Sequence, residues 1–159
     1  MAEQTSNDDF GQIGLTIDKI RIGDKASFGK TLTEADVYQF SGILGNFNPL
    51  YVNTEFVAKT PLKKRVVPTM LVASLVSKVL GTQLPGNGTV HVSQDMEFLQ
   101  PAFIGDTIEA TVEVFRLDGQ LCRIWFEVRC TNQHGELVAR GQTEVKPPCN
   151  RCGRCGRDV

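Results

Sequence analysis

Apolar and polar side chains alternate along four segments in the second half of the chain. The apolar members, with one glutamine in phase, are Val90, Val92, Gln94, Met96 and Phe98; Ile108, Ala110, Val112 and Val114; Cys122, Ile124, Phe126, Val128 and Cys130; and Leu137, Ala139 and Val145. A period of two is typical of strands that bury one face. Asp118-Gly119 and His134-Gly135 separate consecutive segments and favour hairpin turns. With a further strand near residues 25–30, the pattern predicts an antiparallel meander.

The stretch before these strands predicts two helices. Residues 33–36 (Thr-Glu-Ala-Asp) have the Ser/Thr-x-x-acid pattern of a helix start, and apolar residues follow at helical spacing up to Leu44. We expect this helix to end in a loop near Gly42 and Gly45. Asn53 is expected to cap a short second helix, because its side chain can accept from a first-turn N–H.

Residues 68–81 predict a third, longer helix that is apolar on most faces. Pro68 suits the first helical position and Gly81 a C-terminal cap. A helix that is apolar nearly all round is expected to be buried. The prediction is therefore an α+β fold in which a curved antiparallel sheet wraps around a long central helix.

Length and composition fit one globular domain. The chain has 159 residues, of which 41% are hydrophobic and 22% charged. Its 17 basic and 18 acidic residues give a net charge of −1, which excludes the basic footprint of nucleic-acid or anionic-membrane binding. The polar N-terminus and the lack of a long apolar run predict a cytoplasmic protein without a membrane partner. Cytosolic thiols are held reduced, so Cys122 and Cys130 are expected to be small core residues.

The two ends of the chain differ from its body. Residues 1–16 have little periodicity and are expected to form an N-terminal extension, residues 17–146 the domain, and residues 147–159 a tail. From Lys146 onward, four basic side chains and one acidic one give a net charge of +3, which leaves −4 for residues 1–145. The tail is therefore chemically distinct from the domain.

Three cysteines in the tail have the spacing of metal ligands. Cys149, Cys152 and Cys155 match the first three positions of a ferredoxin-type cluster run, whose fourth position falls on Val159. A zinc ion would also need a fourth ligand from elsewhere. Metal binding, redox or disulfide pairing, and a passive basic tail are the alternatives that this motif leaves open.

Three segments carry a resemblance to a known family: residues 45–51 (Gly-Asn-Phe-Asn-Pro-Leu-Tyr), the helix at 65–81, and residues 93–106, which begin Ser-Gln-Asp-Met-Glu-Phe. In order and with matching spacing, from about Ile22 to Val145, the chain resembles the MaoC-like (R)-specific enoyl-CoA hydratases, which have the hotdog fold. The resemblance implies a homodimer with its site at the subunit interface and a role in fatty-acid metabolism. It also implies an acyl-CoA or acyl-carrier thioester as substrate, with coenzyme A part of that substrate and no resident cofactor.

The two catalytic positions of the family motif are changed in this chain. The family loop reads Gly/Ser-Asp-x-Asn-Pro-x-His, and its Asp and His manage the addition or loss of water. Here Asn46 stands at the Asp position and Tyr51 at the His position. An amide is not a base, and an unperturbed phenol titrates near pH 10. Losing a general acid or base costs about 10² to 10⁴ in rate.

Other parts of the family site are kept. Asn48 retains the loop motif, and Ser77 matches a serine that borders the site on the central helix. The family polarises the thioester carbonyl with a backbone N–H of a His-Gly-Met segment, which matches Pro68-Thr69-Met70 here, so the Thr69 N–H can still hold an oxyanion. Gln94 is also expected to contact the substrate.

Three functions are consistent with the sequence. The first is (R)-specific hydration or dehydration, in which Asn46 orients the water molecule and Tyr51 acts as a donor or a positioning group. The second is thioester binding or regulation without turnover, and the third is a metal or redox module through the cysteine tail. His91, Asp95 and Glu97 are expected on the solvated strand face, opposite Gln94, which makes them weak replacement acids. The basic residues 63–65 either bind coenzyme A phosphates or form a solvated loop.

Overall fold

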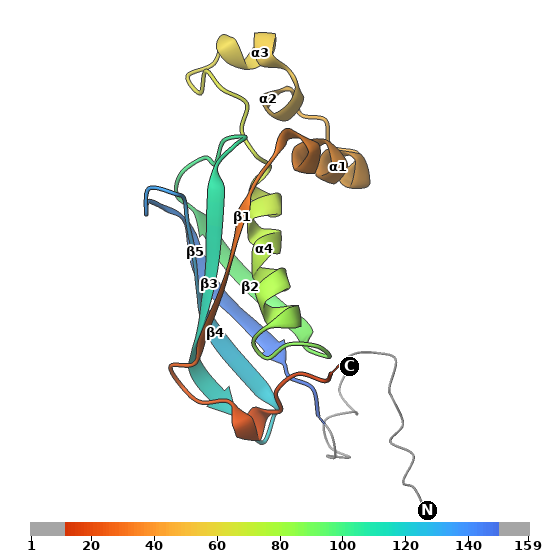
Figure 1. The fold of residues 1–159 in the computed structure, drawn as a ribbon, viewed down its shortest axis with the longest axis vertical. Helices are drawn as coiled ribbons and strands as arrows, with labels where there is room; N and C mark the ends of the chain where they lie inside the picture. Colours follow the sequence, from red (N-terminus) through yellow and green to blue (C-terminus); the bar gives the residue numbers. More distant parts are fainter. Residues whose placement is uncertain (1–11, 150–159) are drawn as a thin grey trace, which may run out of the picture.

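The computed structural model describes residues 12–149. A five-stranded sheet, antiparallel at every pairing and in the order β1-β3-β4-β5-β2, curves around the helix α4 (Figure 1). The strands are β1 (Lys25–Thr31), β2 (Val90–Phe98), β3 (Thr107–Asp118), β4 (Arg123–Thr131) and β5 (Leu137–Lys146). The remaining helical segments are η1 (Ile17–Lys19), α1 (Glu34–Leu44), α2 (Pro49–Val52) and α3 (Thr54–Ala58), with α4 spanning Thr69–Thr82. Both predicted hairpin connections and the antiparallel pairing are confirmed. The predicted meander is confirmed only for β3-β4-β5, because β2 pairs with β5 rather than with β3.

The core lies between α4 and the concave face of the sheet. Residues such as Val72, Val76 and Val79 on α4 pack against Val112 and Phe126 of the sheet, all at most 2% exposed. The helix is not buried all round, however, because Met70, Ser74 and Ser77 form an exposed stripe along it. This stripe faces away from the core and contributes to the site described below.

The ends of α4 differ from the prediction in two details. Pro68 is the N-cap rather than the first helical residue, because its ψ of 127° is extended. Gly81 lies inside the helix, which continues to Thr82 and closes with a hydrogen bond from Gln83 N–H to Val79 O of 2.9 Å. A glycine near a helix end is therefore not always the cap.

The start of α1 is a capping box, as predicted. Thr33 Oγ1 accepts from the Asp36 N–H at 3.3 Å, and Asp36 Oδ2 accepts from the Thr33 N–H at 2.8 Å. These hydrogen bonds with Thr33 lower the pKa of Asp36. Gly45 ends the helix in the left-handed conformation, with φ of 67°, so the helix runs through Gly42.

Replacing Thr33 by alanine is expected to lower the free energy of unfolding by about 1 kcal/mol, since the first-turn N–H loses its acceptor. Denaturant unfolding at pH 7 measures this loss. Thr54→Ala is the matched control, because Thr54 is exposed in the first turn of α3 and Asn53, not Thr54, caps that helix. An equal loss in both variants would contradict a specific role for the capping box.

The strand β2 contains a bulge that overturns part of the predicted pattern. His91 pairs with Val145 and Ser93 with Glu144, so the register shifts between His91 and Ser93. Paired residues share a face, and Val145 is buried. His91 therefore points to the concave face rather than the solvated face that the alternation predicted. Val90 and Val92 are exposed, because the extra residue changes the phase of a period-two pattern, and the His91 side chain is also exposed at this end of the strand.

Two smaller elements and the cysteines complete the fold. The one-turn helix α2 was not predicted, whereas Asn53 caps α3 as expected, accepting from the Phe56 N–H at 2.9 Å. Cys130 is a buried core thiol as predicted, and burial raises its pKa to about 11. Cys122 is also buried, but it is disulfide-bonded, which differs from the expected reduced thiol.

Candidate functional site

The loop after α1 carries the first predicted site residues, and its amides shape the backbone. Asn46 is exposed, and its Oδ1 accepts from the Asn48 N–H at 3.3 Å. Asn48 Oδ1 in turn accepts from the Leu50 N–H at 3.0 Å and caps α2, whose first residue is Pro49. Asn48 thus keeps the loop geometry as predicted, and the Asn46 carbonyl oxygen is used within the turn.

Tyr51 lies half-buried on α2 and packs against the core. Its backbone N–H donates to Asn48 O at 2.8 Å, and Leu50 O accepts from the Val66 N–H at 3.1 Å, which ties this segment to the chain entering α4. Within residues 12–149, neither Asn46 nor the Tyr51 hydroxyl hydrogen-bonds to a carboxylate or an imidazole. Neither side chain gains an acid or base partner that would restore proton transfer.

The N-terminus of α4 offers free backbone donors. Pro68 is buried, has no N–H and makes no side-chain cap. The Leu71 N–H is the first in the helix to bond back, to Pro68 O at 2.9 Å. The N–H groups of Thr69 and Met70 therefore have no helical partner, and they lie where the helix dipole favours negative charge. The Thr69 N–H is chemically able to hold an oxyanion, as the resemblance implied.

An apolar cavity of about 580 Å³ lies between α1, the exposed stripe of α4 and the concave face of β2. It is lined by Phe40 and Leu44 of α1; Met70, Ala73, Ser74 and Ser77 of α4; and Gln94, Met96 and Phe98 of β2. The Ser74 hydroxyl donates to Leu71 O at 2.6 Å, and Gln94 Nε2 lies 2.7 Å from Met96 Sδ. Apolar cavities with a few polar groups are typical ligand sites.

The structure divides the predicted site residues into two groups. Ser77 and Gln94 meet in the cavity, whereas Asn46, Asn48 and Tyr51 lie on the neighbouring loop and helix α2, with Pro68 and Thr69 at the N-terminus of α4. The sequence interpretation missed all six apolar lining residues: Phe40, Leu44, Met70, Ala73, Met96 and Phe98. A signal existed, since Met70, Ser74 and Ser77 recur at helical spacing and form one stripe.

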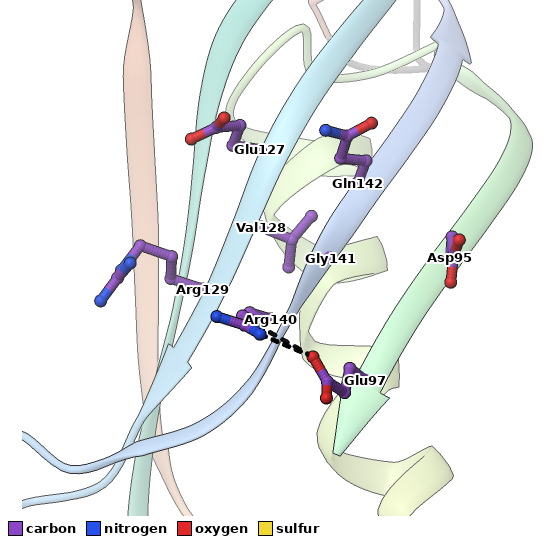
Figure 2. Close-up of a pocket in the computed structure, with 8 residues that line it drawn as sticks. All are labelled: Asp95, Glu97, Glu127, Val128, Arg129, Arg140, Gly141 and Gln142. Atoms are coloured by element: carbon purple, nitrogen blue, oxygen red, sulfur yellow. Dashed lines mark hydrogen bonds and ion pairs between the residues drawn. The ribbon is translucent and has the colours of Figure 1, made fainter. Parts of the chain in front are cut away.

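A second, charged hollow of about 370 Å³ lies on the convex face of the sheet. Figure 2 shows its lining, with the ion pair between Arg140 and Glu97, which has an N–O distance of 2.9 Å. Asp95 and Glu97 both belong to this outer hollow, as the strand alternation predicted. Neither carboxylate is therefore in the apolar cavity to replace the missing general acid or base.

The basic stretch before α4 is partly engaged within the protein. Arg65 forms an ion pair with Glu34 and donates to Tyr38 Oη at 3.2 Å, and the hydrogen bond to Glu34 raises the pKa of Arg65. Lys63 Nζ donates to Ala58 O at 3.1 Å. Lys64 is exposed. Arg65 therefore links α1 to this loop, and phosphate binding by the stretch stays a prediction.

The tail motif falls mostly outside the described residues. Cys152 and Cys155 lie beyond residue 149, and Cys149 is disulfide-bonded. Across residues 12–149, no group of three or more His, Cys, Asp or Glu side chains is arranged to hold a metal ion. In the same range, no helix is both long and apolar enough to cross a membrane. Metal binding by the tail stays a prediction.

The fold and the cavity together define a hotdog protein with an apolar cavity beside its central helix. The family model described as MaoC like domain matches residues 19–136. The chain is 40% identical over 129 residues to an (R)-specific enoyl-CoA hydratase of Rhodospirillum rubrum, covering 81% of this chain and 89% of that protein. It is 35% identical over 134 residues to an (R)-specific enoyl-CoA hydratase of Aeromonas caviae, covering 84% and 100%.

Solved structures agree with these relatives. The (R)-hydratase of A. caviae matches with a TM-score of 0.80 and 36% identity, covering 82% of this chain and 98% of that one. An unliganded R-hydratase of Pseudomonas aeruginosa matches with a TM-score of 0.81 and 29% identity, covering 85% and 86%. The chain belongs to the MaoC-like family of (R)-specific enoyl-CoA hydratases and dehydratases and has their hotdog fold.

Proposed function

We propose that this protein binds coenzyme A or carrier-protein thioesters of apolar acyl groups in the cavity between α1, α4 and β2, and that it turns them over far more slowly than relatives with Asp and His. The apolar cavity beside free helix N–H groups supports binding. The amide of Asn46 and the phenol of Tyr51 support slow turnover, because they replace the carboxylate and the imidazole that transfer protons in the family.

The third part of the proposal is that two copies of the chain complete the site. Among residues 12–149, the edge strand β2 pairs with β5 alone, so its other edge has backbone groups that no described strand pairs. Val90 and Val92 on this strand, and Ile43, Leu44 and Met70 near the cavity, are exposed apolar residues. A homodimer formed over this surface would cover them and close the open side of the cavity. It would also allow the predicted site residues that lie outside the cavity to face an acyl thioester; these are Asn46, Asn48, Tyr51, Pro68 and Thr69.

We expect the purified protein to bind crotonyl-CoA but to hydrate it slowly. Calorimetry should show binding, while the loss of enoyl absorbance should be at least about 100-fold slower than for the R. rubrum relative measured alongside. Turnover equal to that of the relative would overturn the slow-turnover part. No heat with crotonyl-CoA or with saturated butanoyl-CoA would overturn the binding part.

A pair of serine variants tests whether the ligand occupies the cavity. Ser77→Leu places extra side-chain volume in the cavity, and overfilling a site of this kind is expected to weaken butanoyl-CoA binding about tenfold. Ser93→Leu is the matched control, because Ser93 is exposed and pairs with Glu144 on the opposite face of β2. Equal affinity in both variants would place the ligand elsewhere.

A further inference from the structure

The concave face of β2 changes from apolar to polar along the strand. Phe98, Met96 and Gln94 line the cavity in turn. The bulge makes His91 the next residue on this face, since it pairs with the buried Val145. Consecutive positions on one face of a strand are about 6.6 Å apart, so His91 lies one step beyond Gln94. On α4 the lining ends with another polar residue, Ser77.

His91 is held in place by a buried threonine. Its Nε2 lies 2.7 Å from Thr143 Oγ1, and Thr143 is only 2% exposed. The Thr143 hydroxyl donates to Ser93 O at 2.9 Å. Because a hydroxyl has one proton, the imidazole Nε2 must be the donor in its own bond with Thr143. Thr143 pairs with Gln94 across the two strands, so this hydrogen-bonded unit adjoins the cavity lining.

The protonation of His91 agrees with this arrangement. Partial desolvation against the sheet lowers the pKa of His91 below its ordinary value of 6.5, while the residue as a whole stays exposed. The imidazole is therefore neutral at pH 7, with Nε2 protonated and Nδ1 left as an acceptor. An alkyl chain that covered Nδ1 would remove its access to water without offering a hydrogen bond, which is unfavourable.

We propose that His91, fixed by Thr143, forms the polar far end of the cavity and restricts the ligand to short acyl groups, such as butanoyl rather than octanoyl. The proposal rests on the thioester site proposed above and adds its chain-length limit. Beyond Gln94, each further methylene would meet the imidazole and the threonine instead of apolar side chains. The usual gain in affinity from a longer chain should therefore stop there.

The ratio of affinities for two saturated thioesters tests the proposal. Each methylene buried in apolar surroundings tightens binding about fourfold, so an unrestricted cavity would bind octanoyl-CoA roughly 200-fold more tightly than butanoyl-CoA. We expect a ratio below about tenfold for the unchanged chain, and a ratio raised about tenfold by His91→Leu. His91→Gln retains a donor for Thr143 and should leave the ratio low. If His91→Leu does not fold, as judged by circular dichroism, His91→Met replaces it.

His134→Leu is the matched control, because His134 is exposed in the turn between β4 and β5. It should leave both affinities unchanged. An unchanged ratio in His91→Leu, or a ratio near 200-fold in the unchanged chain, would overturn the role of His91 while the thioester site stands. Failure of both acyl-CoA ligands to bind would overturn the site and this inference together.

Discussion

The double variant Asn46→Asp, Tyr51→His is expected to hydrate crotonyl-CoA at least about 100-fold faster than the unchanged chain, because it regains a carboxylate and an imidazole that can transfer protons near neutral pH. A gain of 10² to 10⁴ corresponds to about 3 to 5 kcal/mol of barrier. The loss of enoyl absorbance at saturating substrate measures it. The gain should appear mainly in kcat, since the cavity that binds the acyl group is unchanged.

The local structure favours this restoration. Asn46 uses its Oδ1 as an acceptor from the Asn48 N–H, and an aspartate oxygen can accept in the same place. Tyr51 is only half-buried, so the smaller histidine ring leaves little empty space in the core. The hydrogen bonds that hold α2 are made by its backbone, so they do not depend on the side chain at position 51.

The matched control is Asn53→Asp, Tyr38→His, which makes the same chemical changes on α1 and at the cap of α3. Asn53 also accepts from a backbone N–H through its Oδ1, and Tyr38 is exposed. This control should show no gain in turnover. If the site variant also shows no gain while still binding butanoyl-CoA, divergence extends beyond the two catalytic positions, and Thr69→Gly in the same background is the next change to measure.

The fold was predictable because its elements have strong local signals. The capping box at Thr33 and the cap at Asn53 use side-chain chemistry that acts within one turn, so they can be recognised without the rest of the protein. The strands β3, β4 and β5 each bury one face, which imposes a period of two on their sequences.

The bulge in β2 could not be predicted in the same way. Val90 and Val92 continue the apolar alternation of Met96 and Phe98, so the sequence contains no change of phase. The register of β5 decides the matter, since His91 faces inward only when Val145 is its partner. The pattern within β2 alone assigned the imidazole of His91 to the solvated face. The pairing of β2 with β5 places it on the concave face instead.

The candidate site was predictable only in part for a similar reason. Ser77 and Gln94 were identified from the family resemblance, and they do meet in one cavity. The apolar lining residues Met70 and Phe98 look like core residues in sequence, because helix and strand patterns do not distinguish an apolar side chain that packs against protein from one that lines a cavity. Only the arrangement of α1, α4 and β2 separates the two.

Gly141→Ala is expected to lower the free energy of unfolding by about 3 kcal/mol, because β2 and β5 approach closely at this glycine. Gly141 pairs with Met96 of β2 and with Val128 of β4. A Cβ atom there would overlap the backbone carbonyl oxygen of Asp95 and lie 2.9 Å from Met96 Cα. Backbone atoms cannot rotate away as a side chain can, so β2 would have to shift. Met96 lines the cavity, and the shift should therefore also weaken butanoyl-CoA binding.

Gly29→Ala on the edge strand β1 is the matched control, since a Cβ there meets no atom within 4 Å, and its unfolding free energy should stay within about 0.5 kcal/mol of the unchanged chain. Denaturant unfolding of both variants, followed by calorimetry on the folded ones, separates the expected strand displacement from a general effect of alanine in the sheet; equal stability in the two variants would show that β2 tolerates a side chain at position 141.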